Sequence, residues 1–119
     1  MRIHRLAILL IVSLALSIAA CEKGPPPGAI GATVVAENNR GVGLMGQFRY
    51  AEAREVFAHL VDASPELSTL QINMAIATLN RQQPGDERRA LERIEALLAK
   101  QPDDLNAHYV AGLLRRSEE

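Results

Sequence analysis

Apolar residues recur at helical spacing in two stretches of the chain, and the second stretch repeats the first 37 residues later. In each stretch a small residue is followed by a large apolar one after four positions, by leucine after three more and by proline after a further five. This spacing predicts a helix with room for a close neighbour, one apolar stripe and a defined end. Two copies of one unit predict a helical repeat array. The copies are Ala53, Phe57, Leu60 and Pro65, and then Ala90, Ile94, Leu97 and Pro102.

From Val34 onward the periodicity predicts five helices in two and a half repeats. The third helix is apolar on two sides, which is typical of a helix packed by neighbours on both flanks. The fold class is therefore all-α, an array of helical hairpins. The expected ranges of the first four helices are 34–46, 49–63, 66–81 and 86–100. The last helix is expected to begin at residues 102–104 and to run to about 116.

Turn signals separate these helices. Ser64, Pro65 and Glu66 are typical of a helix start, with a capping hydroxyl, a proline in the first turn and an acid near the positive end of the helix dipole. The sequence QQPG at 82–85 breaks the third helix, and Asp86 is the expected cap of the fourth.

Ahead of the array, Arg2 and Arg5 precede an apolar run of 15 residues at 6–20. A transmembrane helix needs about 20 residues, so the run predicts a cleaved export signal. Its end, IAAC at 18–21, resembles the lipobox of bacterial lipoproteins, in which the cysteine thiol receives a diacylglyceryl group. The resemblance implies removal of residues 1–20 and lipidation of Cys21, the single cysteine of the chain. An ordinary secretory signal with a chance cysteine is the alternative.

Residues 21–33 are expected to hold the lipidated cysteine and a tether, and residues 34–119 the folded domain. The stretch EKGPPPGAIGA at 22–32 contains three prolines and three glycines, so it predicts a linker that holds the folded part roughly 20 to 35 Å from the anchor. In lipoproteins of enteric-type bacteria an aspartate after the cysteine favours the inner membrane. Glu22 at that position favours the outer membrane and a domain that faces the periplasm.

The charge of the mature chain argues against nucleic-acid binding. Removal of Arg2 and Arg5 leaves 11 basic and 14 acidic residues, so the formal charge changes from -1 to -3. The sequence has no basic stripe with interleaved aromatic residues. The remaining 99 residues suffice for one small domain with a modest core.

The array resembles the tetratricopeptide repeat (TPR), a 34-residue pair of antiparallel helices that stacks into a right-handed superhelix. The small residue that this family places in its first helix corresponds to Gly41, Ala75 and Gly112. These residues are 34 and then 37 apart, so three extra residues are expected at 82–84. The two copies described above match the family's second helix. The chain departs from the family at Glu37, Gln71 and His108, where a bulky residue is usual, and at Leu60 and Leu97, where a small one is usual.

A narrower resemblance concerns the phrases NNRGVGLMGQFRYAEA, INMAIATLNRQQPGD and HYVAGLLRR. They are similar to the repeat region that precedes the β-propeller of bacterial proteins with FG-GAP repeats and an ASPIC/UnbV-like end. The sequence contains no propeller.

Candidate catalytic and metal-ligating residues are sparse. His59 and His108 do not lie at metal-ligand spacing from another histidine or a cysteine, and His59 is expected on the solvent side of its helix. Carboxylate pairs at i, i+3, such as Glu52 with Glu55 and Glu92 with Glu95, are common in helices rich in Ala, Arg and Glu. No nucleophile elbow, phosphate-binding glycine loop or HExxH is present. We expect no enzyme activity, no cofactor besides the lipid, and no metal.

The TPR resemblance implies that a protein or peptide partner binds the concave face, which the first helix of each repeat lines. We expect an apolar anchor there, with Asn39 and Asn73 holding the backbone of the ligand. The lysines and arginine of a carboxylate clamp are missing, because Asn106 and Val110 stand in two of those positions. A homodimer across the same face is the rival. The expected partner-binding residues are Asn39, Val42, Met45, Ile72, Asn73, Ile76, Leu79, Tyr109 and Leu113.

Two functions fit these observations. The first is a membrane-anchored scaffold that recruits a protein to a complex of the bacterial cell envelope. The second is an accessory or shortened segment of a larger propeller-type protein system.

Overall fold

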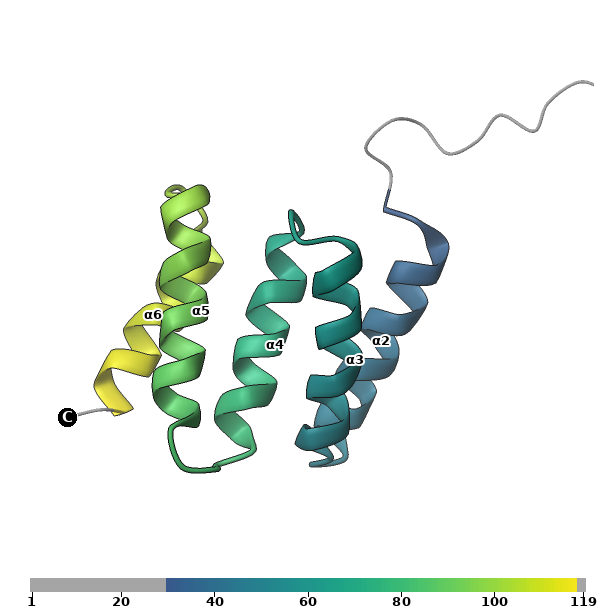
Figure 1. The fold of residues 1–119 in the computed structure, drawn as a ribbon, viewed down its shortest axis with the longest axis horizontal. Coiled ribbons are helices and arrows are strands. Elements are labelled where there is room, and N and C mark those ends of the chain that lie inside the picture. The colour runs from purple at the N-terminus through teal and green to yellow at the C-terminus, as the bar shows by residue number, and fades with distance from the viewer. Residues whose placement is uncertain (1–29, 118–119) are drawn as a thin grey trace, which may run out of the picture.

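The computed structural model describes residues 30–117, and in this range the chain forms five helices and no strand. The fold is the all-α array of helical hairpins that the sequence predicts (Figure 1). The predicted lipidation site Cys21 and residues 1–29 lie outside the described residues. The helices are α2 (Ala32–Gly46), α3 (Tyr50–Ala63), α4 (Ser68–Asn80), α5 (Asp86–Lys100) and α6 (Leu105–Ser117).

The first helix begins earlier than the expected residue 34. Gly31 is extended at the N-cap position, and Ala32 and Thr33 are already helical. The helix therefore takes two residues that the sequence pattern had given to the tether. Neither residue breaks a helix, so nothing local prevents α2 from extending back to the glycine.

The first hairpin, α2 with α3, closes around Gly41. A Cβ atom on Gly41 would lie 2.6 Å from Cζ of Phe57, whose side chain is fully buried. The glycine therefore lets the ring of α3 rest directly on the backbone of α2. Gly41 was named in the sequence as the small residue of a first helix, and this contact shows the close approach that a small residue permits.

Helix α4 lies at the centre of the array and contacts all four other helices. One side of α4 packs Leu70, Met74 and Ala77 into a core shared with α2 and α3. The other side packs Ile72 and Ala75 into a second core with α5 and α6. The prediction that this helix is apolar on two sides because it has neighbours on both flanks is confirmed.

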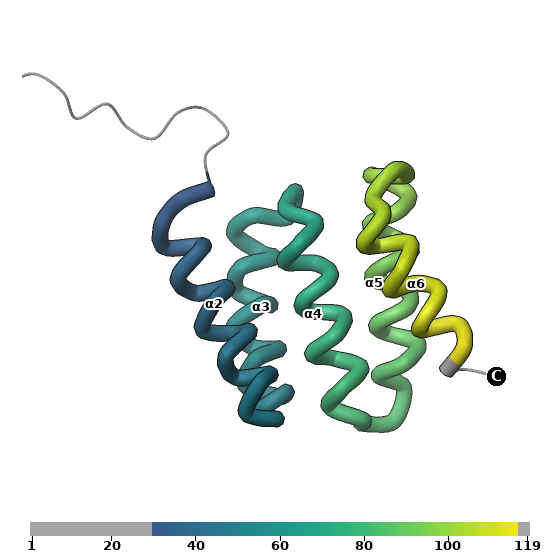
Figure 2. The backbone as a smooth tube through the Cα atoms, turned by 180° about the vertical axis from the view of Figure 1, so that it is seen from behind, coloured from purple at the N-terminus to yellow at the C-terminus, as the bar shows by residue number. Residues whose placement is uncertain are grey.

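The helices form two layers. Helices α2, α4 and α6 follow one another along one layer, where α4 contacts both of the others. Helices α3 and α5 lie on the other side of the array, and Figures 1 and 2 show the two layers from opposite directions. Helices α3 and α5 do not pack against each other, and residues of α4 line the space between them.

Ser64 and Pro65 end one helix and do not begin the next, which corrects the predicted start at residue 66. Ser64 is the C-cap residue of α3, and its backbone N–H donates to the carbonyl of Leu60. Pro65 and Glu66 form a turn, and α4 begins only at Ser68. The pattern of serine, proline and acid suits a turn as well as a helix start, because proline fixes φ at a value common to both.

The connection between α4 and α5 covers residues 81–85, whereas α2 and α3 are joined by residues 47–49. Gln82 and Gly85 have φ of 57° and 81°, the left-handed region that reverses the chain direction. Two of the three extra residues lie in this longer turn. The third lies in α5, which begins four residues before Ala90, whereas α3 begins three residues before Ala53.

Asp86 does not cap α5 in the expected way. It is the first residue of the helix, is almost fully buried, and the N-cap position belongs to Gly85. Its carboxylate accepts two hydrogen bonds from Arg81, at 3.0 and 2.7 Å, one from Arg89 at 2.9 Å and one from the backbone N–H of Gln83 at 2.9 Å. These bonds hold the pKa of Asp86 well below its ordinary value, with the Arg81 bonds as the largest cause. Asp86 therefore ties the turn to both helices that it joins.

Candidate functional site

Three apolar side chains occupy equivalent positions on the layer of first helices. Val42, Ile76 and Leu113 each follow the small residue of their helix, so they point to the same side of α2, α4 and α6 in turn. Val42 is 44% exposed and Leu113 39% exposed, while Ile76 is half-buried. We call Val42, Ile76 and Leu113 the apolar stripe.

Other residues predicted for partner binding lie in the core. Ile72 is 8% exposed and packs in the second core, so little of its side chain is accessible to a partner. Leu79 is half-buried against the same core, and Met45 against the first. Positions 72, 76 and 79 all pack on the second core, and of these Ile72 is buried while Ile76 and Leu79 are only partly covered.

The two asparagines predicted to hold a ligand differ in their surroundings. Asn39 is exposed, whereas Asn73 is half-buried and donates from Nδ2 to Oδ1 of Asn38 at 2.9 Å. This bond joins α2 to α4 across the layer of first helices. Asn73 therefore has a structural partner, and Asn38 is a residue that the sequence analysis did not select.

A shallow groove between α2 and the start of α4 was also missed. It has a volume of about 270 Å³ and is lined mainly by Ile30, Val34, Val35 and Leu67, with Asn38 at its edge. Val35 is 45% exposed. Ile30 lies in the stretch assigned to the tether, so the sequence did not place it beside Val34, Val35 and Leu67.

Helix α6 exposes a further apolar face that contains the predicted residue Tyr109. Tyr109 and Leu105 are both largely exposed, and Gly112 between this face and the stripe has open space where a Cβ would lie. At the equivalent position of α2, Gly41 is covered by Phe57. In residues 30–117 the helices that contact α6 are α4 and α5, and α6 has no following helix that packs on it as α3 packs on α2.

The candidate acid–base residues take part in surface ion pairs. Glu52 pairs with Arg49, Glu92 lies 3.7 Å from Arg88, and Glu95 lies 3.0 Å from Arg115. His108, at the start of α6, donates from Nε2 to the carbonyl of Pro102 at 2.7 Å. In residues 30–117 no group of three or more His, Cys, Asp or Glu side chains is placed to hold a metal ion.

None of the five described helices has the length and apolar character needed to cross a membrane. Comparisons of the chain with protein-family models, with curated proteins and with solved structures find no match.

Proposed function

We propose that the protein is a lipid-anchored scaffold of the bacterial cell envelope, built as a TPR-type array, whose apolar stripe binds a segment of a partner protein. The observation that carries this proposal is the alignment of Val42, Ile76 and Leu113 at equivalent positions of three successive first helices. Neighbouring apolar side chains that stay exposed or partly exposed on one surface are typical of a protein interaction site.

The chemistry of the stripe favours an apolar ligand. The helical turns that carry its three residues also carry the uncharged Asn39, Gly43 and Asn80, while Arg40 pairs with Glu37 and Arg116 lies near the α6 end of the stripe. An amphipathic helix or an extended segment with apolar residues at regular spacing fits such a row. Asn39 is free to hydrogen-bond the backbone of that ligand, since in the described residues its side chain makes no hydrogen bond.

Site-specific crosslinking in a bacterial host tests the stripe. A photoreactive amino acid placed at Val42 or at Leu113 should capture the same partner protein from both positions. The matched control is the same amino acid at Glu87, which is exposed on α5 in the other layer. Different adducts from the two stripe positions, or an equal yield from Glu87, would contradict the proposal.

The Ile76→Asp variant adds a second criterion. A carboxylate in the middle of the stripe should abolish both crosslinks, because burial of an unpaired charge against a partner is unfavourable. Circular dichroism of the variant must remain helical for this result to count. A crosslinked product with twice the mass of the chain would show that the stripe binds a second copy of this chain and not a different protein.

The lipid anchor is the part of the proposal that rests on the N-terminal residues. Arg2, Arg5, the apolar run and the lipobox-like IAAC at 18–21 support export and lipidation of Cys21. Labelling with a palmitate analogue should mark the protein, and Cys21→Ser should lose both the label and the association with membranes. A Cys21→Ser protein that keeps the label would exclude this anchor.

A further inference from the structure

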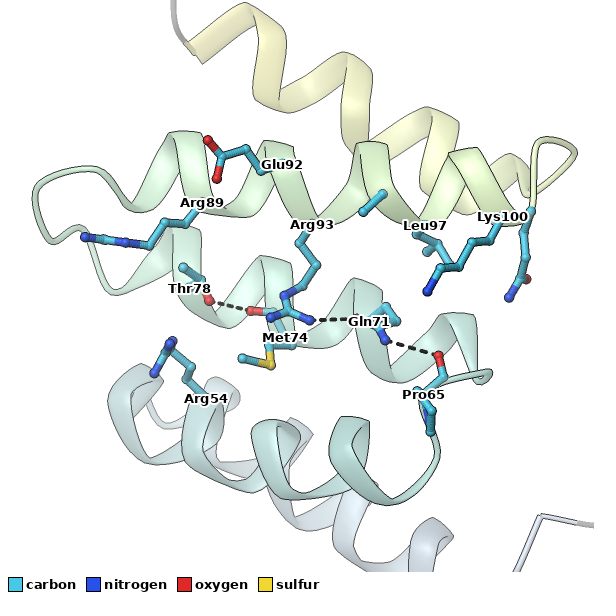
Figure 3. A pocket seen from close by; sticks show the side chains of 12 residues that line it. Arg54, Pro65, Gln71, Met74, Thr78, Arg89, Glu92, Arg93, Leu97 and Lys100 are labelled. Carbon is cyan, nitrogen blue, oxygen red and sulfur yellow. Dashed lines mark hydrogen bonds between the residues drawn. The ribbon is translucent and has the colours of Figure 1, made fainter.

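A basic groove lies between α3 and α5, on the side of the array opposite the apolar stripe. Both helices pack on α4 and not on each other, so residues of α4 form the floor of the groove. Its volume is about 490 Å³, and Met74 and Thr78 of α4 lie at its base (Figure 3).

Four cationic side chains line this groove. Arg54 comes from α3, and Arg89, Arg93 and Lys100 come from α5. The three positions on α5 recur at intervals of four and seven residues, so they lie along one face over about 16 Å. Figure 3 shows them in this order along the groove. Glu92 is the one carboxylate among the lining residues, and it pairs with Arg88.

Arg54 and Arg93 are incompletely paired. The Nε atom of Arg54 is buried without a hydrogen-bond partner, and Arg54 makes no ion pair in the described residues. Arg93 donates from Nη1 to Oε1 of Gln71 at 2.7 Å, a neutral acceptor. Burial lowers the pKa of Arg93, and repulsion from Arg54 lowers it further, while Asp62 of α3 partly offsets both. A buried donor without a partner is rare in folded proteins and calls for an acceptor.

We propose that this groove binds an acidic peptide segment, with carboxylates of the ligand placed between Arg54 and Arg93. A carboxylate there supplies a charged acceptor to the guanidinium groups that line the groove and relieves the repulsion between them. Paired guanidinium and carboxylate groups form charge-assisted hydrogen bonds, the strong class of such bonds. Arg89 already bonds Asp86, and Lys100 extends the positive potential to the other end.

The length and floor of the groove favour a peptide over an isolated phosphate ion. One phosphate is too small to meet cations spread over about 16 Å. Met74 and Leu97 give the groove an apolar base that suits the aliphatic stem of a glutamate side chain.

Fluorescence anisotropy with the full chain in detergent tests the proposal. The probe is a labelled peptide of about eight residues in which glutamate and alanine alternate, long enough to span the groove when extended. The matched probe replaces each glutamate with glutamine. The glutamate peptide should bind, its affinity should fall as salt is raised to about 0.5 M, and the glutamine peptide should not bind. No binding of the glutamate peptide at low salt, or equal binding of both peptides, would overturn the proposal.

Two variants locate the site. Arg54→Gln combined with Arg93→Gln should weaken binding about tenfold or more, since two charged hydrogen-bond donors are lost. Arg40→Gln combined with Arg115→Gln removes the same charge from exposed positions outside the groove and should change affinity less than about twofold. Equal losses in both variants would show that general charge, and not the groove, holds the peptide.

A phosphate competition distinguishes the two anion classes. Inorganic phosphate should displace the peptide only at concentrations where sodium chloride of equal ionic strength does so too. Displacement by phosphate at much lower ionic strength would show that the groove is a phosphate site and not a site for an acidic peptide. The groove and the apolar stripe lie on different layers, so failure of this proposal leaves the proposed function unaffected, and the reverse also holds.

Discussion

The contact between Gly41 and Phe57 is the residue-scale feature on which the first hairpin depends. Gly41→Ala should destabilise the fold by about 1 to 2 kcal/mol, because overpacking outweighs the better helix propensity of alanine. The added Cβ would lie 2.6 and 2.7 Å from two ring atoms of a fully buried side chain that has no free space to move into. Urea denaturation followed by circular dichroism measures the change.

Gly43→Ala provides the matched control in the same helix. A Cβ at Gly43 has no atom within 4 Å, and the position is exposed. The substitution should therefore stabilise the protein by up to about 1 kcal/mol through helix propensity alone. If both variants shift the urea midpoint in the same direction, the contact between Gly41 and Phe57 does not determine the stability change of Gly41→Ala.

Asp86 is a second residue on which stability depends. Asp86→Asn should cost about 2 to 3 kcal/mol at neutral pH, because it removes the charge that Arg81 and Arg89 bond and leaves the Arg81 guanidinium only weakly paired. Asp103→Asn, at an exposed position in the next turn, should change stability by less than about 0.5 kcal/mol.

The same ion pairs predict a pH dependence. The folded protein keeps Asp86 ionised below the ordinary carboxyl pKa of 3.8, whereas the unfolded chain takes up a proton there. The stabilisation by Asp86 is therefore complete above about pH 4 and decreases as the pH falls further. The difference in unfolding free energy between the wild type and Asp86→Asn should shrink below pH 4. A constant difference down to pH 3 would contradict the assignment.

At the scale of elements, the start of α6 shows how a cap differs from a turn. The Oδ1 atom of Asp104 accepts the backbone N–H of Ala107 at 2.9 Å, and this bond is the main cause of the lowered pKa of Asp104. Asp104→Ala should destabilise the protein by about 1 kcal/mol through loss of this N-cap. Ser64→Ala should cost less than about 0.5 kcal/mol, because Ser64 ends α3 through its backbone N–H and carbonyl, and alanine keeps both. Thermal melting of both variants ranks the two positions.

Helix boundaries were partly predictable from the sequence. The range of α5 was predicted at both ends, since QQPG stops α4 and the apolar stripe of α5 is regular. The start of α4 was missed by two residues because Ser64 to Glu66 form a turn. A local motif cannot distinguish these outcomes, since the direction of the chain after Pro65 is set by the packing of α4 on α3.

At the scale of the whole molecule, α4 joins two cores into one folding unit. Phe57 lies at the centre of the first core and Ile94 at the centre of the second, and both side chains are fully buried. Phe57→Ala should cost about 3 to 5 kcal/mol and Ile94→Ala about 2 to 5 kcal/mol. Each variant should unfold in a single transition, because loss of either core removes one side of α4. Two separate transitions in calorimetry would show that the hairpins unfold independently.

The apolar stripe follows in part from the sequence, whereas the basic groove depends on how the helices pack. The apolar stripe was predicted in part, since Val42, Ile76 and Leu113 follow from their position after the small residues. The burial of Ile72 was not predicted, because a period of 3.6 places it close to Ile76 on the helix surface, whereas the packing buries Ile72 and covers Ile76 only in part. The basic groove was not predicted, since Arg54 and Arg93 are far apart in sequence and converge only across α4.

The sequence by itself determined the helical class, the order of the helices, the notch at Gly41 and the two-sided character of α4. These features follow from periodicity and residue size, which act over one or two helical turns. Only the tertiary structure decided that Asp86 is buried between two arginines, that Asn73 bonds Asn38, and that α3 and α5 leave a basic groove between them. These features depend on distances between different helices, and those distances are set by how side chains fill the two cores around α4.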